Sequence, residues 1–590
     1  MRNIKPYLVC LVILASHSII LAQSKYNLNF DDFNSEKQAM PDGWFKWGNF
    51  KNITGEKSGA DNYVGKVISD SKGKFGCITY MIPANYVGDT IRLSGRIKFE
   101  NVKDYVGLMM RIDGGSDGGF LALEDGSHLK IRGTNDWKEY AIKLPYPSGA
   151  ESIYVGGILS GGGTAWFDDF KVEIDGKDIQ TLKETPKITL ESYDSTKLYS
   201  AISNSSRPIN FETSNTLSAS LDPLIAELGD KKIVAIGEST HGTSEFYKLR
   251  EAITKRLIQE EGFNMVILES PYDNIELLNK DLETKPLDNL IMKHLFSIYQ
   301  TQEMKSFLQW YQNNRSKYNI SFKGCDDSNW VFYEVLADKL VGIKDSELDK
   351  LMKKLKSNIT KGSKSNSKNE LSLGINIYNN LVTIEKYLKS TNNLTKPVEE
   401  IIFNGKNTYI NYVNIKSKKQ FQSRDEIMAE RISYLAKDKN NKIIVWAHNA
   451  HISNEIIVDK EIGIMGRDLK QEFGDDYHSI GLTTLKGSYS FIDEKSINGD
   501  PVFTNKLKKG SIESTDTLLW ENVLAQNGDS FYLNLSALKE ELNTDDVLGP
   551  IKFIGYNKET NKDIYKLPLF KDFDSLIFIE NTNATTPLFN

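Results

Sequence analysis

IVAIGESTHG, at residues 233–242, is the stretch that decides the fold. Its first four residues are apolar and predict a short buried strand, while residues 243–260 have the pattern of a helix. Glu238 and His241 therefore follow the carboxyl end of a strand, which is the edge where open α/β sheets bind ligands. The stretch predicts an α/β sheet with a candidate site at that edge.

Polar residues follow further apolar runs in the same way. The run at 265–268 is followed by Glu269, and the run at 442–446 is followed by His448 and His451. A fourth run, at 320–324, leads to Asp326. If these strands are parallel neighbours, their carboxyl ends converge and all these side chains share one cleft. A histidine beside a carboxylate at such a place is suited to general-base chemistry.

Taken together, the motifs resemble the erythromycin esterase family over roughly residues 190–590. The residues that carry the resemblance, in chain order, are Gly237-Glu238, His241-Gly242, Arg250, Glu269, Gly324, Asp326, Ser423-Arg424-Asp425, Met428-Ala429-Glu430, Trp446-Ala447-His448-Asn449-Ala450-His451, Met465-Gly466 and Asp574 to Ile579. Family members often carry a Trp shortly before a Thr-x-Glu stretch, where this chain has Tyr299 before Thr301. This difference leaves the shape of the substrate open.

The resemblance implies a hydrolase that cleaves an ester or lactone with a histidine-activated water and without a metal or other cofactor. It assigns His241 as the base and has Glu238 and Glu269 orient the base or the water. In the family's pattern, His448, His451 and Arg250 would stabilise the reacting groups. Asp326 and Tyr299 would contact the substrate. A macrolide lactone, and hence antibiotic resistance, is the substrate and role that the family name implies.

Other interpretations of the same residues stay open. The Glu and His set could hold a metal ion, which would make the chain a metal-dependent hydrolase. The chain could also be a catalytically silent surface protein that binds glycans. Glu238 could simply cap the following helix, and Arg250 could be a surface residue. A serine hydrolase of the usual kind is disfavoured because the chain lacks a Gly-x-Ser-x-Gly motif.

The chain has 590 residues and a net charge of −6. This length predicts more than one domain. Proteins that bind nucleic acids usually carry an excess of basic residues, and this chain does not. Residues 1–22 have the pattern of a signal peptide, with Arg2 and Lys5 before an apolar stretch. We therefore expect a periplasmic or secreted protein without a membrane span after cleavage.

The predicted fold is an N-terminal all-β jelly-roll sandwich followed by an α/β domain with a mostly parallel central sheet and a helical insertion. Short strands separated by turns indicate the sandwich at 25–175, and a linker follows at 176–195. The α/β domain spans 196–590, with its insertion at about 334–435. The closing pattern from Ala165 to Val172 resembles the last strand of galactose-binding-like jelly rolls. In such a module Trp44, Trp47 and Trp137 could stack on a glycan, but a sandwich core also uses tryptophan.

Overall fold

A computed structural model describes residues 24–589 except for 35–37, 61, 70–73, 115–119, 148, 186–187, 329–330, 363–366, 418, 420, 456–464, 498–499, 514–517, 545–546, 557 and 559–562. The signal peptide predicted at 1–22 lies outside these residues. It stays a prediction, as does the periplasmic or secreted location.

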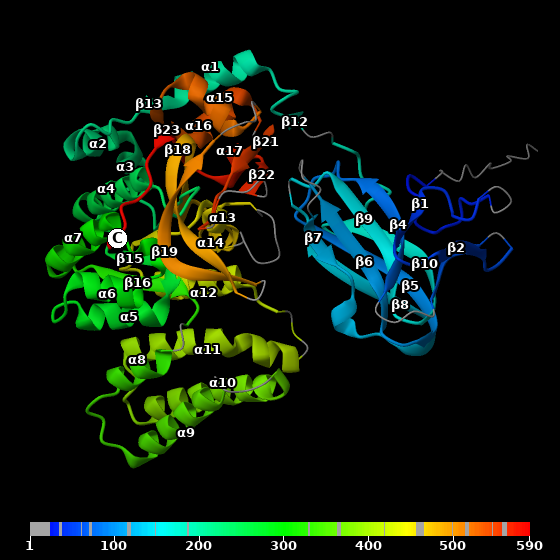
Figure 1. The fold of residues 1–590 in the computed structure, drawn as a ribbon, viewed down its shortest axis with the longest axis horizontal. Coiled ribbons are helices and arrows are strands. Elements are labelled where there is room, and N and C mark those ends of the chain that lie inside the picture. Colours follow the sequence, from blue (N-terminus) through cyan, green and yellow to red (C-terminus); the bar gives the residue numbers. More distant parts are fainter. Residues whose placement is uncertain are drawn as a thin grey trace, which may run out of the picture.

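The N-terminal domain is an antiparallel β-sandwich, shown in blue and cyan in Figure 1. Its buried core is a hydrophobic cluster of its own, which includes Phe30, Trp44 and Phe167. One sheet has the order β1-β4-β9-β6-β7 and the other β2-β3-β10-β5-β8, with β11 paired to β10. The strands are β1 Trp44–Gly48, β2 Asn52–Lys57, β3 Tyr63–Ser69, β4 Phe75–Pro83, β5 Thr90–Val102, β6 Tyr105–Asp113, β7 Phe120–Glu124, β8 Gly133–Pro145, β9 Ser152–Ser160, β10 Gly163–Ile174 and β11 Lys177–Asp178.

The second domain is built on a mixed sheet with the order β13-β20-β23-β18-β14-β17-β15-β16. The six neighbouring strands from β23 to β16 are parallel, while β13, β20 and the hairpin strand β19 run antiparallel to their partners. The strands are β13 Ser206–Pro208, β14 Ile233–Ile236, β15 Met265–Pro271, β16 Ser321–Asp326, β17 Ile443–Trp446, β18 Tyr477–Ile497, β19 Asp500–Ile512, β20 Ser530–Asn534 and β23 Ser575–Thr582. A small sheet joins β12 Ile188–Thr189, β21 Val547–Lys552 and β22 Ile564–Leu567.

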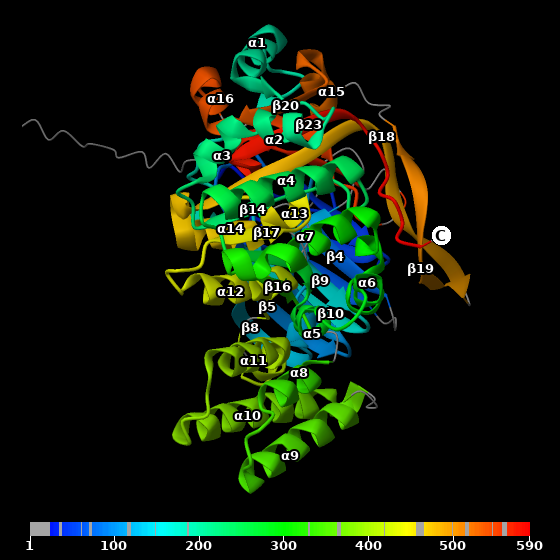
Figure 2. The ribbon, with the colours of Figure 1, turned by 90° about the vertical axis from the view of Figure 1, so that its left-hand side faces the viewer.

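Helices cover both faces of this sheet (Figure 2). Alternate residues of β14 point to opposite sides, so Val234 and Ile236 join one hydrophobic cluster and Ile233 and Ala235 join the other. On the first side lie α2 Ser214–Ser220, α3 Asp222–Leu228, α4 Ser244–Glu260, α5 Tyr272–Asp281, α6 Leu287–His294 and α7 Gln302–Tyr318. On the second lie α1 Ser195–Ser205, α12 Arg424–Ala436, α13 Asn449–Ile452, α14 Met465–Phe473, α15 Trp520–Leu524, α16 Leu535–Leu542 and α17 Leu569–Asp572.

The helical insertion forms a layer of its own at the β16 side of the sheet (Figure 1). Its helices share a separate hydrophobic cluster that includes Phe332, Leu381 and Ile402. They are α8 Phe332–Lys339, α9 Ser346–Gly362, α10 Ser367–Ser390 and α11 Lys396–Lys416. The expected insertion, 334–435, also contained α12, but Met428 and Ile432 of α12 pack against the sheet. Helix α12 therefore belongs to the α/β layer.

Polar contacts join the two domains. Arg467 of α14 forms an ion pair with Asp89 of the sandwich at 3.1 Å, and Lys566 pairs with Glu151. The segment predicted as a linker is partly structured, because β11 pairs with the sandwich and β12 pairs with β21 of the second domain. Among the helices of the described residues, none combines the length and the apolarity that a bilayer crossing requires.

Because the sandwich has its own core, we expect residues 188–590 to fold without it. Surface ion pairs such as Arg467–Asp89, in which Asp89 is exposed and Arg467 half-buried, contribute only about 0–1 kcal/mol, so their loss leaves the second domain nearly as stable. Differential scanning calorimetry of the full chain and of residues 188–590 measures this. The melting temperature of the second domain should change by less than about 5 °C. An unfolded or aggregated product would show that the two domains depend on each other.

Candidate functional site

The loop after β14 holds a buried carboxylate between a histidine and an arginine. Glu238 Oε1 lies 2.7 Å from Nδ1 of His241, and Glu238 Oε2 lies 2.8 Å from Nη1 of Arg250. Arg250 Nη2 also donates to the carbonyl oxygens of Ile236 at 3.1 Å and Ala447 at 2.6 Å. Arg250 thereby ties the ends of β14 and β17 together and fixes Glu238 between itself and the imidazole.

This arrangement sets the tautomer of His241. Glu238 Oε1 accepts a hydrogen bond from the Nδ1–H of His241, which leaves the lone pair on Nε2. His241 is 7% exposed, whereas Glu238 and Arg250 are fully buried. Arg250 is therefore neither a surface residue nor in reach of the carbonyl of a substrate, and it holds the Glu238 carboxylate instead.

Backbone hydrogen bonds hold the loop on several sides. The carbonyl of Gly242 accepts the N–H groups of Ser490 at 2.8 Å and Thr585 at 2.9 Å. The N–H of Ile554 donates to the carbonyl of Ser239 at 2.6 Å. A Cβ at Gly242 would overlap the carbonyl oxygen of Ser490, so this close approach to β18 requires glycine. The position of His241 is thus fixed by three separate segments.

Glu269, in β15, is the second buried carboxylate of the site. Its Oε1 lies 3.0 Å from Nη2 of Arg424 and 3.3 Å from Nε2 of His451, and its Oε2 accepts the N–H of His448 at 2.9 Å. Burial disfavours the charge of Glu269, but the positive charges of His451 and Arg424 outweigh it and lower its pKa well below the usual value. Glu269 is therefore ionised at neutral pH.

The first turn of α12 supplies two further charged groups. A capping box of Ser423 and Glu426 starts this helix, which places Arg424 and Asp425 at the site. Arg424 binds Asp326 through two hydrogen bonds, from Nε at 2.8 Å and from Nη2 at 2.7 Å. The guanidinium of Arg424 thereby balances the charge of Asp326, and it also contacts Glu269.

His451 lies between two carboxylates. Its Nδ1 is 2.9 Å and 3.0 Å from the two carboxylate oxygens of Asp425, and its Nε2 faces Glu269. Burial opposes the charged form, but Glu269 and Asp425 outweigh burial and raise the pKa of His451 to about 10. At neutral pH His451 is an imidazolium.

His448 is neutral and has a defined tautomer. Its Nδ1 accepts the N–H of Ala450 at 3.2 Å, so Nε2 carries the proton and donates to the carbonyl of Ile554 at 3.3 Å. Burial and the nearby His241 and His451 lower its pKa to about 3. The rings of His241 and His448 lie 5.0 Å apart, centre to centre, so a basic nitrogen and an N–H donor are neighbours.

The structure brings seven of the eight predicted site residues together. They are Glu238, His241, Arg250, Glu269, Asp326, His448 and His451. Tyr299 differs, because it is 1% exposed and donates its hydroxyl to the carbonyl of Glu269 at 3.2 Å. The buried Tyr299 thus supports the backbone of β15. This position does not match the predicted contact with substrate.

Sequence reasoning missed three residues of the site. Arg424 and Asp425 stood in the quoted Ser423-Arg424-Asp425 motif, but no role at the site was predicted for either. Tyr556 lies beside His241, with a distance of 6.1 Å between the ring centres. Nothing in the sequence around Tyr556 marks it, because a connection outside the predicted strands brings it there.

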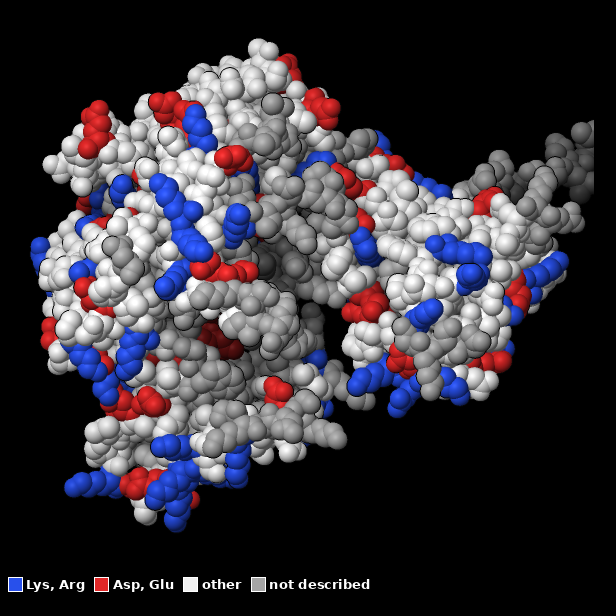
Figure 3. Space-filling view, in the orientation of Figure 1, with Lys and Arg blue, Asp and Glu red and all other residues white. Residues whose placement is uncertain are grey.

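The described residues contain no group of three or more His, Cys, Asp or Glu side chains arranged to hold one metal ion. The imidazoles and carboxylates of the site instead contact one another and two arginines. Figure 3 shows a recess between the sandwich and the larger domain, and basic and acidic side chains alternate on this face. Such a surface has no broad basic patch of the kind that nucleic-acid binders use.

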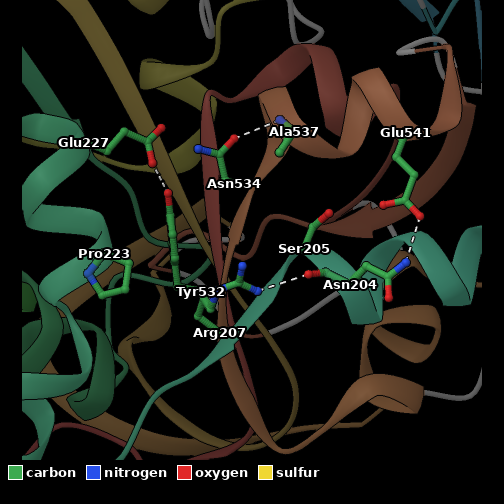
Figure 4. A pocket seen from close by; sticks show the side chains of 9 residues that line it. All are labelled: Asn204, Ser205, Arg207, Pro223, Glu227, Tyr532, Asn534, Ala537 and Glu541. Atoms are coloured by element: carbon green, nitrogen blue, oxygen red, sulfur yellow. Dashed lines mark hydrogen bonds between the residues drawn. The ribbon is translucent and has the colours of Figure 1, made fainter.

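A separate pocket of about 360 Å³ lies among α1, α3, β20 and α16 and shares no residue with the site. In its wall the hydroxyl of Tyr532 meets the carboxylate of Glu227, and Arg207 reaches the carbonyl of Asn204 (Figure 4). The hydroxyl of Tyr532 and the guanidinium of Arg207 are thus bound to other groups of the protein. The pocket carries none of the predicted site residues.

Comparisons with known proteins place this geometry in context. The sequence model described as "Erythromycin esterase" matches residues 258–582, which include Glu269, His448 and His451 but begin after His241. The erythromycin esterase type II of Escherichia coli is 26% identical over 337 residues, which are 49% of this chain and 79% of that protein. The putative hydrolase YbfO of Bacillus subtilis is 24% identical over 51% of this chain and 75% of that protein.

Among solved structures, a Bacillus cereus protein aligns with a TM-score of 0.56 and 21% identity, over 67% of this chain and 99% of that chain. A structure described as a succinoglycan biosynthesis protein aligns with a TM-score of 0.54 and 20% identity, over 66% of this chain and 98% of that chain. At these identities the two structures support the fold of the second domain.

The raised pKa of His451 makes the stability of the protein depend on pH. The imidazolium stabilises the folded state fully below the ordinary pKa of about 6.5, and this contribution is lost as the pH rises towards 10. The free energy of unfolding of the wild type should therefore exceed that of His451→Gln by more at pH 7 than at pH 9.5, by on the order of 2 kcal/mol. Urea denaturation at both pH values measures the difference.

His478→Gln is the matched control. His478 is also buried, but burial lowers its pKa, so it is neutral in both states above pH 7. The difference between this variant and the wild type should stay constant between pH 7 and 9.5. A constant difference for His451→Gln as well would contradict a charged His451.

Proposed function

Because this chain belongs to the erythromycin esterase family and its family membership supports a hydrolase, we propose that it hydrolyses a carboxylic ester or lactone with a water activated by His241. The observation that carries the proposal is the buried series Arg250, Glu238 and His241. An imidazole whose Nδ1 is bound to a carboxylate presents a basic Nε2, which is the group that such a reaction requires.

In the proposed first step, Nε2 of His241 takes a proton from water while the water oxygen attacks the ester carbonyl. The Glu238 carboxylate stabilises the imidazolium that forms, and Arg250 holds Glu238 in place. The tetrahedral intermediate then collapses and its C–O bond to the alcohol breaks. His241 returns the proton to the leaving alkoxide, so the products are an acid and an alcohol and the base is regenerated.

The second histidine pair supports the oxyanion in this proposal. The Nε2–H of His448 donates to the carbonyl of Ile554 at 3.3 Å, and its ring lies 5.0 Å from that of His241, so an oxyanion formed beside His241 could take this N–H in place of the carbonyl. His451 and Arg424 are fixed positive charges behind Glu269. They hold Glu269, which in turn holds the backbone N–H of His448. A macrolide lactone is one substrate within this class.

A metal-dependent hydrolase is the alternative that uses the same residues. In this structure Nδ1 of His448 accepts a backbone N–H, and the two ring nitrogens of His451 face Asp425 and Glu269, so both imidazoles would have to give up present partners to hold a metal. An imidazole must be neutral, with a free lone pair, to bind a metal. Assays in the presence and absence of a chelator separate the two mechanisms.

His241→Ala should lower kcat for hydrolysis by about 10²–10⁴-fold, because it removes the general base. Glu238→Gln should lower kcat as well, because it removes the charge that stabilises the imidazolium. The measurement is mass spectrometry of a panel of macrolides and simple esters after incubation with chelator-treated protein, where hydrolysis adds one water. His128→Ala is the control, since His128 is an exposed histidine of the sandwich. Full activity in His241→Ala would rule out this base.

We also propose that the sandwich binds a glycan on the outer face of the β1-β4-β9-β6-β7 sheet. Trp47 and Tyr154 form an edge-to-face pair at 5.3 Å, and Phe45 lies beside both. The guanidinium of Arg111 lies 5.1 Å from the ring of Trp47 and binds Asp113 with two hydrogen bonds, of 2.5 Å and 2.8 Å. Rings for stacking thus lie next to groups that can bind hydroxyls.

The other two predicted tryptophans have different environments. Trp44 is 5% exposed, stacks on Phe30 at 3.9 Å and donates Nε1 to the carbonyl of Asn27. Of its two expected roles, Trp44 therefore has the one in the core, and its ring is not available to a glycan. Trp137 lies on the opposite sheet, where the guanidinium of Arg96 covers its ring at 5.4 Å.

Trp47→Ala should abolish binding of any soluble polysaccharide that the wild type retards in affinity electrophoresis, because the variant loses the stacking ring. Trp137→Ala is the matched control and should bind as the wild type does. Equal retardation of Trp47→Ala and the wild type across the panel would contradict this surface.

A further inference from the structure

Two large aromatic rings lie exposed beside the buried base. The ring of Tyr556 is 6.1 Å from the imidazole of His241 and within 27° of parallel to it. The ring of Phe503 meets Tyr556 edge-on at 5.3 Å. Tyr556 is 41% exposed and Phe503 is 43% exposed, while His241 is 7% exposed. The exposed surface next to the base is therefore aromatic.

Both rings are carried by backbone that the fold holds in place. The carbonyl of Tyr556 accepts the N–H of Ile492 in β18 at 2.8 Å, and two residues earlier Ile554 binds the loop of the base. Phe503 lies in β19 and pairs with Glu494 of β18. The hairpin β18–β19 and the segment 553–556 thus position the two rings against each other and against His241.

Exposure of these rings to water is unfavourable in the free protein. Each square ångström of apolar surface that a ligand covers contributes about 25 cal/mol, so a ligand with a hydrocarbon face gains affinity here. An aromatic or branched group also matches the geometry, because rings pack well face-to-face with an offset or edge-to-face. A small ester, by contrast, leaves most of this surface wet.

We propose that Tyr556 and Phe503 form an apolar subsite that selects esters with a ring or bulky hydrocarbon group next to the scissile bond. This inference rests on the proposed ester hydrolysis at His241, and it adds the class of substrate. The two residues determine specificity, whereas the proton transfers belong to His241.

The test compares matched esters in a pH-stat, which records the acid released. Benzyl acetate and ethyl acetate differ on the alcohol side, and ethyl phenylacetate and ethyl acetate differ on the acyl side. The wild type should prefer one of the aromatic esters by at least about tenfold in kcat/KM. Tyr556→Ala and Phe503→Ala should each reduce that ratio at least threefold, and Tyr556→Phe should retain it because the ring remains.

Phe75→Ala is the control for loss of an exposed phenylalanine, since Phe75 is 40% exposed on the sandwich. It should leave both the rate and the ratio unchanged. Hydrolysis without an aromatic preference, or a preference that survives both alanine variants, would overturn the subsite while leaving the esterase intact.

A binding measurement decides the case in which none of the three esters is hydrolysed. Saturation-transfer NMR detects weak contacts of benzyl acetate and ethyl phenylacetate with His241→Ala, in which turnover is blocked. The aromatic protons of at least one ester should receive saturation, and this signal should fall when Phe503→Ala is added to His241→Ala. An unchanged signal, or no signal from either ester, would overturn the subsite independently of the reaction.

Discussion

The buried ion pair between Arg250 and Glu238 is the constraint on which the site depends. Both side chains are fully excluded from water, so neither charge is tolerable without the other. Removal of one partner of such a pair costs about 3–5 kcal/mol. Arg250 also binds the backbone carbonyls at the ends of β14 and β17, so the same side chain joins two central strands and holds the carboxylate that orients the proposed base, His241. A substitution of Arg250 would therefore disturb both the central sheet and the site.

A second charge network lies beside the first and has a different character. Glu269, Arg424, Asp326, His451 and Asp425 alternate in sign, and several of them share one partner. This network fixes the state of two histidines in opposite ways, since His451 is kept charged and His448 is kept neutral. Titratable groups whose environments push their pKa values apart are a recurring means of separating acid and base roles.

Local sequence was sufficient to predict the strand ends and the residues that follow them. Apolar runs at 233–236, 265–268 and 443–446 are the strands β14, β15 and β17, and parallel pairing brings Glu238, Glu269 and His448 together. This works because a parallel strand buried on both faces is apolar throughout, and such a run is visible without any knowledge of its partners. The helical insertion was predicted too, although its last helix belongs to the sheet.

The sequence could not predict contacts that depend on distant segments. Tyr299 has an apolar ring and one polar hydroxyl group. Its neighbours in the sequence do not show whether the ring faces the cleft or is buried against β15. The pairing of Asp425 with His451 requires α12 to start beside α13, which only tertiary packing decides. Trp44 and Trp47 are three residues apart, but the ring of one is in the core and that of the other is on the surface. The alternation of a strand gives this difference only once its register is known.

The hydrogen-bonded loop around Gly242 has a consequence for the reorganisation that accompanies catalysis. Its carbonyl and that of Ser239 are bound by N–H groups from β18, from Ile554 and from Thr585, so the loop has few conformations left to lose. The conformational entropy of this segment is given up when the protein folds, before any substrate is present. If His241 is the base, as proposed, its loop needs almost no rearrangement on binding, and substrate affinity is not consumed in ordering it.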